Sequence, residues 1–379
     1  MGEGSGQASS FWLNEGNLDM CRILHIAVCN IAGVPLEFVR AERALGYYSR
    51  LITFTPSPYG FGEDICLHLP LISDLPWQLF KGLLGYRNPE TANLRAKPSQ
   101  IPPIWRPRNR LESWLINLRD LIWKERVMKF SQGFDLFGFD VYQLDGGLGF
   151  TRRGEIIRKL KQSGKRIVCC YLGSDLRIRG VIPEIDELSD LNLTVEFDHL
   201  SLHPNIHHIF FPFNPWNYEL KDRDSQRLKI CHSPSQRRAK GTEKIISTVR
   251  ELEKRYPVEL VLIEDLPHDK AVELLFSCDI AIDQLGELGY GISSLESLSM
   301  GIPTCSCLLP DYESYIPDHP FINVNEGNLR EKLVELIQDE SYRRQKGLEG
   351  RRWVESHHDY RKVAEKIHLL YRKSEWAPQ

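Results

Sequence analysis

From residue 21 onward, short runs rich in apolar and β-branched residues alternate with longer segments in which apolar positions recur at helical spacing. In the first half, this pattern predicts a strand at 22–29, a loop through Gly33, a helix near 36–45 and a strand at 50–54. Further strands are expected at 65–71, 140–144, 166–171 and 207–211, with a helix over 153–162. Because strands that alternate with helices form parallel sheets with crossover connections, we interpret this half as one doubly wound domain.

A proline-punctuated and then highly polar stretch at 211–227 follows and is typical of a connector. The alternation then restarts, with strands expected at 228–232, 258–264, 279–284, 302–308 and 321–324 and helices at 242–255, 270–276, 329–338, 341–357 and 360–372. The predicted fold class is therefore α/β, with two doubly wound Rossmann-like domains that face a cleft. We expect a flexible tail at 1–20, a first domain at 21–212, a linker at 213–227, a second domain at 228–356, and a C-terminal helix at 357–379 that packs back on the first domain.

The composition is that of an ordinary soluble protein, and 379 residues suffice for two domains with a core each. With a net charge of -3 the chain has no general basic field, so nucleic acid is not an expected partner. Its nine cysteines lack paired CxxC spacing, which favours reduced thiols in a cytoplasmic protein. The first twenty residues do not resemble a signal peptide, and no apolar stretch reaches the roughly 18 residues that a membrane span needs.

A glycine-rich turn follows the third strand of the second half and leads into a short helix with one carboxylate, Glu296. Gly289 and Gly291 let the backbone approach a ligand, and the free N–H groups of a helix start favour an anion. Glu296 lies about 7.5 Å along the helix axis from Gly291, which suits a carboxylate on a ribose while phosphates sit at the helix start. An ordinary tight turn before a buried helix is the alternative interpretation.

A basic turn follows the first strand of the second half and also leads into a helix. Its planar guanidinium lets Arg237 bind phosphate oxygens, and Lys240 offers a point charge beside the backbone donors of the helix start. The alternative interpretation is a solvated charge cluster at a surface turn. We expect Arg238 to face solvent in either case. Because ligands bind at the carboxyl ends of parallel strands, both turns are expected to reach one nucleoside diphosphate.

These turns resemble the retaining, nucleotide-sugar-dependent glycosyltransferases of the GT-B fold, the large family that includes sucrose and glycogen synthases and bacterial enzymes of polysaccharide biosynthesis. The resemblance covers nearly the whole chain and is strongest between His232 and Thr304, where Leu295-Glu-Ser-Leu-Ser-Met-Gly-Ile-Pro-Thr304 looks like a characteristic helix and its exit. It implies a first domain on the acceptor side and a second that binds the nucleotide sugar. The implied donor-binding residues are Arg237, Lys240, Gly289, Gly291, Ser293, Ser294 and Glu296.

The sequence departs from the family pattern at two positions. Eight residues before Glu296, where the family has a glutamate that contacts the donor sugar, this chain has Leu288, with Glu287 adjacent. Three interpretations stay open: a rearranged turn in which Glu287 acts as the catalytic glutamate, a donor sugar held differently, or a protein without activity. The second departure is Leu172, which stands where the family often has a histidine.

In the chemistry that the resemblance implies, Arg237 and Lys240 stabilise the departing diphosphate electrostatically, so neither a metal nor a cofactor is expected. The sequence Asp222-Arg-Asp224 superficially resembles the carboxylate pair of metal-dependent glycosyltransferases, but it lies in the polar connector and we assign it to solvent.

The acceptor-side candidates follow strands of the first domain, at Asn30, Gly33, Gly146, Gly147 and Asp175. Asp175 belongs to a Gly-Ser-Asp turn that resembles one in bacterial members of the family. It is a candidate for orienting an acceptor hydroxyl or acting as a base, and a helix-capping aspartate is the simpler alternative.

Residues 95–129 contain nine Lys or Arg against three Asp or Glu, with three tryptophans interspersed. A helix from about Leu111 would place Trp114, Leu115, Leu118 and Ile122 on one face. Such a helix can lie on the anionic inner face of a membrane, where a lipid-linked acceptor is found, or its apolar face can pack on the first sheet.

The leading hypothesis is a cytoplasmic glycosyltransferase that uses a nucleotide sugar and a glycan or lipid-linked acceptor. A nucleotide-sugar epimerase or hydrolase of the same fold is one alternative. The other is a non-catalytic module that binds a nucleotide sugar or a partner protein.

Overall fold

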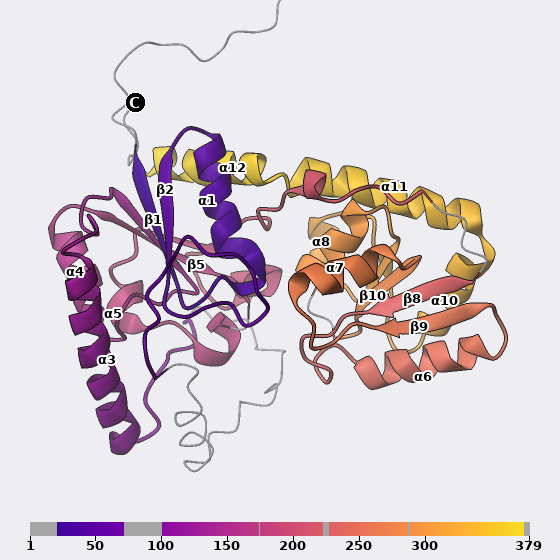
Figure 1. The fold of residues 1–379 in the computed structure, drawn as a ribbon, viewed down its shortest axis with the longest axis horizontal. Coiled ribbons are helices and arrows are strands. Elements are labelled where there is room, and N and C mark those ends of the chain that lie inside the picture. The colour runs from indigo at the N-terminus through magenta and orange to yellow at the C-terminus, as the bar shows by residue number, and fades with distance from the viewer. Residues whose placement is uncertain (1–20, 72–100, 174, 223–226, 287–288, 375–379) are drawn as a thin grey trace, which may run out of the picture.

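The computed structural model describes residues 21–71, 101–173, 175–222, 227–286 and 289–374. Two α/β lobes lie side by side, each built around a sheet (Figure 1). Helix α11 (Glu340–His357) runs along the second lobe, and α12 (Tyr360–Lys373) continues in the same general direction along the first.

The first lobe contains a parallel sheet with strand order β3-β2-β1-β4-β5-β6-β7. Its strands are β1 (Arg22–Ala27), β2 (Tyr48–Thr53), β3 (Ile65–Cys66), β4 (Val141–Asp145), β5 (Arg166–Tyr171), β6 (Leu191–Thr194) and β7 (His207–His208). Its helices are α1 (Val34–Ala44), α3 (Arg110–Phe130), α4 (Glu155–Gln162) and α5 (Pro183–Asp186), and shorter helical turns lie at Ile31–Gly33, Asp175–Arg179 and Phe197–Ser201. In register, His25 of β1 lies between Leu51 of β2 and Gln143 of β4.

The second lobe contains a parallel sheet with strand order β12-β11-β10-β8-β9. Its strands are β8 (Leu228–His232), β9 (Val258–Leu262), β10 (Ile280–Gln284), β11 (Thr304–Ser306) and β12 (Ile322–Asn323). Its remaining helices are α6 (Thr242–Glu253), α7 (His268–Phe276), α8 (Ile292–Ser299), α9 (Pro310–Tyr315) and α10 (Leu329–Gln338), and a short turn at Pro215–Asn217 precedes the lobe.

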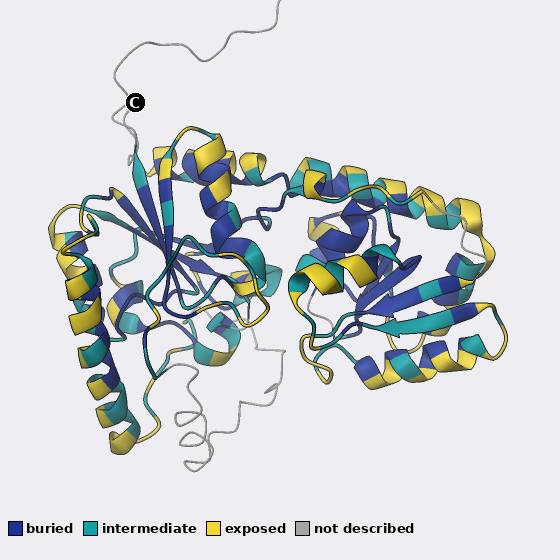
Figure 2. Cartoon of the chain, in the orientation of Figure 1, coloured by how far each residue is buried: buried dark blue, intermediate teal, exposed yellow. Residues whose placement is uncertain are grey.

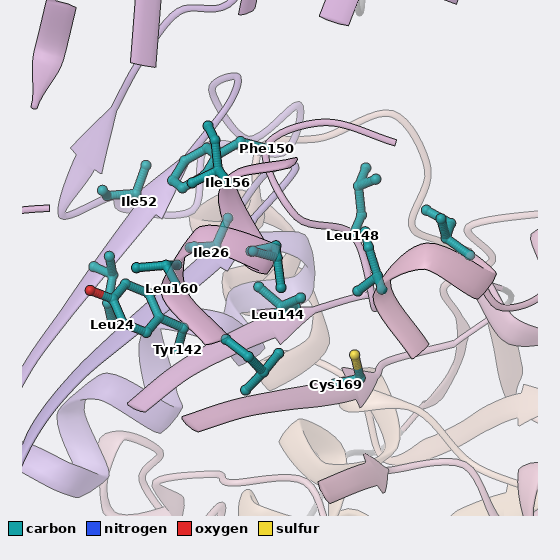
Figure 3. Close-up of a cluster of buried hydrophobic side chains, with 14 of the residues drawn as sticks. Leu24, Ile26, Ile52, Tyr142, Leu144, Leu148, Phe150, Ile156, Leu160 and Cys169 are labelled. Atoms are coloured by element: carbon teal, nitrogen blue, oxygen red, sulfur yellow. The ribbon is translucent and has the colours of Figure 1, made fainter. Parts of the chain in front are cut away.

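The central strands are mostly buried on both faces, as expected for sheets covered by helices on both sides. Leu24 and Ile26 of β1 contribute to a core shared with β4 and α4 (Figure 3), and Ile23 contributes to the apolar cluster on the other face. Burial is concentrated in the strands, and the outward faces of the helices are exposed (Figure 2).

An apolar cluster joins the two lobes. It contains Phe38 and Phe213 from the first lobe and linker together with Tyr290 and Trp353 from the second. Phe197 stacks on Tyr312 across this contact, with ring centroids 4.6 Å apart and planes 5° from parallel. The lobes are therefore held by aromatic packing as well as by the linker.

His358 anchors the return of the chain to the first lobe. Its backbone carbonyl accepts from the Phe213 amide at 2.9 Å. Burial lowers the pKa of His358 to about 3, so the neutral ring donates from Nδ1 to the Phe211 carbonyl (3.0 Å) and accepts from the Tyr290 hydroxyl (3.0 Å). Beyond it, His368 of α12 stacks on Tyr47 at 4.1 Å, next to α1.

The predicted fold class is confirmed: both lobes are doubly wound. The sequence pattern missed β6, a four-residue strand in which Asn192 and Thr194 interrupt the apolar run. The edge strands β3 and β7 are shorter than predicted, with two residues each. The exact domain boundaries stay predictions.

Candidate functional site

In each sheet, the strand order reverses between two neighbouring strands, which are β1 and β4 in the first lobe and β8 and β10 in the second. Ligands of open parallel sheets bind at the carboxyl ends of such strands. Asn30 and Gly33 follow β1, Gly146 and Gly147 follow β4, Arg237 and Lys240 follow β8, and the glycine turn follows β10. Most of the predicted residues therefore lie at these two points.

The turn after β8 is fixed by His232, the last residue of that strand. Burial lowers the pKa of His232 to about 4, so the ring is neutral. Its Nδ1 donates to the Ile282 carbonyl of β10 at 2.8 Å, and its Nε2 accepts from the Thr242 hydroxyl at 2.8 Å. The start of α6 is thereby tied to both strands, which holds the basic turn in place.

Asp283 connects the basic turn to the glycine turn. Its carboxylate forms an ion pair with Lys240 and accepts hydrogen bonds from the Gly291 amide (3.1 Å) and the Ser294 hydroxyl (2.7 Å), with Ser293 at 3.4 Å. Burial raises the pKa of Asp283, but Lys240 and these hydrogen bonds lower it by more, so the group is ionised. The donors at the start of α8 therefore converge on a carboxylate of the chain itself, and an anion site for a ligand there stays a prediction.

The two glycines of the turn after β10 have different environments. Gly289 has φ +92°, and a Cβ placed there would lie 2.8 Å from the Tyr312 ring. Its carbonyl accepts from the Ser306 hydroxyl at 2.7 Å. Gly291 has extended backbone with φ -122°, and a Cβ there would meet nothing within 4 Å among the described residues. Gly289 is thus needed by the fold, whereas Gly291 leaves open space beside the start of α8.

Arg237 lies in the same turn as Lys240 but has other partners. Its guanidinium binds both oxygens of Glu264 at 2.9 and 2.7 Å and one oxygen of Glu243 at 2.7 Å. The side chain is 43% exposed. A diphosphate would have to compete with these two carboxylates, and the role of Arg237 stays a prediction.

Glu296 lies in α8 and lines a cavity of about 280 Å³ between the lobes. Its carboxylate is 9% exposed and accepts from the Tyr218 hydroxyl at 3.2 Å. His268, the first residue of α7, places Nε2 2.5 Å from the same oxygen. The ring of His268 packs on Phe61 of the first lobe with centroids 4.2 Å apart. The predicted ribose-binding carboxylate therefore faces a cavity to which both lobes contribute.

Two of the predicted acceptor-side residues, Asn30 and Gly33, line this cavity. Asn30 is buried, and its side chain accepts from the Leu36 amide (3.2 Å) and donates to the Gly62 carbonyl (2.6 Å). Gly33 has φ +77°, and a Cβ there would lie 3.1 Å from Phe61. Asn30 therefore ties the 60–62 loop to the start of α1, and Gly33 leaves room for Phe61 to pack closely in the cavity wall.

The other acceptor-side residues are not part of the described lining of this cavity. Asp175 accepts from the amides of Leu172 (3.0 Å) and Leu176 (2.7 Å), whereas a helix-capping aspartate accepts from an amide two or three residues further along the chain. A Cβ at Gly146 would lie 3.4 Å from Asp175, and one at Gly147 would lie 2.5 Å from Tyr171. Their functional assignments stay predictions.

Three residues of interest, Glu287, Leu288 and Asp224, lie outside the described residues. The sequence patterns did not identify four residues that the structure places at the two turns or in the cavity wall: Asp283, Glu37, Tyr218 and His268. A signal that could have identified Asp283 is the acidic residue that directly follows the apolar residues Ile-Ala-Ile of β10.

Helix α3 lies at the outer side of the first lobe (Figure 1). Trp123 and Val127 face the core, whereas Leu111, Trp114, Leu118 and Leu121 are exposed. The sequence predicted an apolar face there, and part of that face is exposed. Within the described ranges, no helix combines the length and apolar content needed to cross a bilayer.

No protein-family model and no curated protein matches the chain. Among solved structures, it is similar to sucrose-phosphate synthase from Thermosynechococcus elongatus, at 11% identity over 93% of this chain and 98% of that one, with a TM-score of 0.57. It is also similar to HepE from Anabaena in complex with UDP-glucose, at 10% identity over 93% of this chain and 99% of that one, with a TM-score of 0.56. At such identities the likeness shows the fold: the chain has the GT-B fold of glycosyltransferases.

Proposed function

We propose that the chain is a glycosyltransferase that moves a sugar from a nucleotide-diphosphate sugar to a glycan or lipid-linked acceptor, with retention at the anomeric carbon. The observation that carries the proposal is the arrangement around α8. Glu296 of this helix faces the cavity between the lobes, and Lys240, Gly291 and Ser294 gather at its start. Support from the fold comes from HepE, which was solved with UDP-glucose.

In this proposal, the diphosphate binds beside Gly291 and the ribose hydroxyls bind Glu296. Negative charge develops on the diphosphate as the glycosidic bond breaks, and Lys240 and Arg237 stabilise it there. Asp283 holds the ammonium of Lys240 in position before the donor arrives. Neither a metal nor a cofactor takes part, because these two cations supply the charge stabilisation.

A non-catalytic nucleotide-sugar-binding module is the second candidate. The specific observation in its favour is that both cations already have carboxylate partners, Asp283 for Lys240 and Glu264 with Glu243 for Arg237. Such pairing suits a site that binds a donor weakly and does not turn it over.

A thermal-shift panel of nucleoside diphosphates and nucleotide sugars tests the proposal, followed by product detection with the best binder. Stabilisation followed by sugar transfer to an added glycan supports it. Free sugar or an epimerised nucleotide sugar would identify a hydrolase or epimerase instead. Stabilisation without any product favours the binding module, and no stabilisation by any member excludes a nucleotide site.

We also propose that the protein contacts an anionic membrane surface through α3 when it meets a lipid-linked acceptor. Trp114 and Leu121 are 59% and 63% exposed, and Leu111 and Leu118 lie along the same helix. Arg106, Arg108 and Arg110, at its start, are exposed too. An apolar helix face flanked by cations matches the interface of a bilayer that contains anionic lipids.

A further inference from the structure

Glu37 lies in the first turn of α1, on the first-lobe wall of the cavity that Glu296 lines from the second lobe. One carboxylate oxygen, Oε2, accepts from Arg40 at 3.0 Å. The other, Oε1, is buried and has no hydrogen-bond partner among the described residues. The side chain is only 12% exposed. A buried carboxylate oxygen without a partner is costly for the fold, so a donor from a ligand would relieve that cost.

The charges around the cavity indicate which kind of donor fits. Three carboxylates line it, at Glu37, Asp269 and Glu296, against one guanidinium at Arg40. The Tyr218 hydroxyl, which also lines the cavity, donates to Glu296 at 3.2 Å, and burial together with the charges of Glu296 and Glu37 raises its pKa. An anionic group would be repelled here, whereas sugar hydroxyls can donate to carboxylates.

We propose that Glu37 accepts a hydrogen bond from a hydroxyl of a neutral sugar ring of the bound nucleotide sugar, across the cavity from Glu296. This inference rests on the proposed function and adds a specificity-determining residue from the lobe that does not carry α8. Two rings of a nucleotide sugar offer such hydroxyls, the ribose and the transferred sugar. In both cases one ligand bridges α1 and α8.

The experiment compares binding by isothermal titration calorimetry in two arms. The ribose arm uses UDP against 2′-deoxy-UDP, and the transferred-sugar arm uses UDP-glucose against UDP-glucuronate. If guanosine nucleotides are the best binders in the thermal-shift panel, the corresponding guanosine compounds replace these uridine ligands. The variants are Glu37→Gln, which removes the charge and keeps the shape, and Glu37→Ala, which removes the acceptor. Glu253→Gln is the matched control, because Glu253 also pairs with an arginine three positions away on a helix and its side chain is 16% exposed.

We expect the wild-type protein to bind the first ligand of at least one arm about tenfold more tightly than the second. In the ribose arm, the second ligand lacks a hydroxyl that can donate to a carboxylate. In the transferred-sugar arm, the second ligand carries a carboxylate that the cavity repels. That preference should fall at least threefold in both Glu37 variants and persist in Glu253→Gln. Unchanged ratios in both arms, with normal UDP binding, would overturn the role of Glu37 and leave the proposed function intact. Absence of any nucleotide binding by the wild-type protein would overturn both.

Discussion

The ammonium of Lys240 forms an ion pair with the buried carboxylate of Asp283, and this pair ties the turn after β8 to the end of β10. The backbone reinforces the link, because the Leu285 amide donates to the Lys240 carbonyl at 3.1 Å. The position of the cation is therefore set by the fold before any ligand binds. This preorganisation is what electrostatic stabilisation of a leaving group requires.

The first prediction concerns the pH dependence of stability. The pKa of Asp283 is lower in the folded chain than its ordinary value, so the folded state favours the ionised group. Its contribution to the free energy of unfolding is present above the unfolded pKa of about 4 and is lost as the pH falls through the lower folded value. Asp283→Asn should therefore lower stability by about 3 kcal/mol at pH 7, since it leaves a partly buried ammonium unpaired.

Urea unfolding between pH 3 and pH 8 measures this effect. The difference between wild-type and Asp283→Asn should shrink below about pH 4. Glu273→Gln is the control, because Glu273 and Lys270 form an exposed ion pair that is screened by water and should contribute little to stability at any pH. A pH-independent difference would contradict the assigned ionisation of Asp283.

The second prediction separates the two cations. Arg237→Ala and Lys240→Ala should each weaken binding of a nucleoside diphosphate by about 1–3 kcal/mol, the magnitude expected for lost charge-assisted hydrogen bonds. Only Lys240→Ala should also lower stability, because Arg237 is largely exposed. Glu264→Gln should strengthen binding by freeing the Arg237 guanidinium. Calorimetric titration tests all three variants, and unchanged affinity in both alanine variants would remove the assignment.

The third prediction uses the two glycines of the turn after β10. Gly291→Ala adds a methyl group to open space, so the fold should be unaffected while diphosphate affinity falls at least tenfold through the lost close approach. Gly289→Ala should instead lower stability by roughly 1–2 kcal/mol or more, because it combines a positive φ with a clash on Tyr312. Parallel unfolding and titration experiments check both. Equal diphosphate affinity of Gly291→Ala and wild-type protein would place the phosphates elsewhere.

The fourth prediction concerns Glu296. Glu296→Gln keeps the shape of the side chain but weakens its hydrogen bonds to ribose hydroxyls, so it should reduce binding of UDP more than binding of 2′-deoxy-UDP. Tyr218→Phe removes one hydrogen bond to the carboxylate and leaves the carboxylate itself in place, which makes it the control. A Glu296→Gln protein that fails to fold would show that Glu296 is structural.

Much of the fold could be predicted because β1, β5, β8 and β10 are short segments of mainly apolar residues that are mostly buried. The same pattern located the turns with Lys240 and Gly291, since each directly follows such a strand. The pattern could not reveal that Asp283 occupies the donors of those turns, because this depends on how two distant segments meet. The pairing of Glu37 with Glu296 around one cavity likewise exists only once the lobes are packed together.

The fifth prediction concerns α3. If its exposed face meets anionic bilayers, the protein should sediment with phosphatidylserine-containing vesicles at low salt and much less in about 0.5 M salt, where charge attraction is screened. The double variant Trp114→Ser with Leu121→Asp should reduce the bound fraction at least fivefold, since both side chains are more than half exposed on this face. Leu348→Asp is the matched control, because Leu348 is 49% exposed on α11 in the other lobe. Failure of the wild-type protein to sediment at low salt would exclude this surface, and it would leave a water-soluble glycan as the acceptor to test.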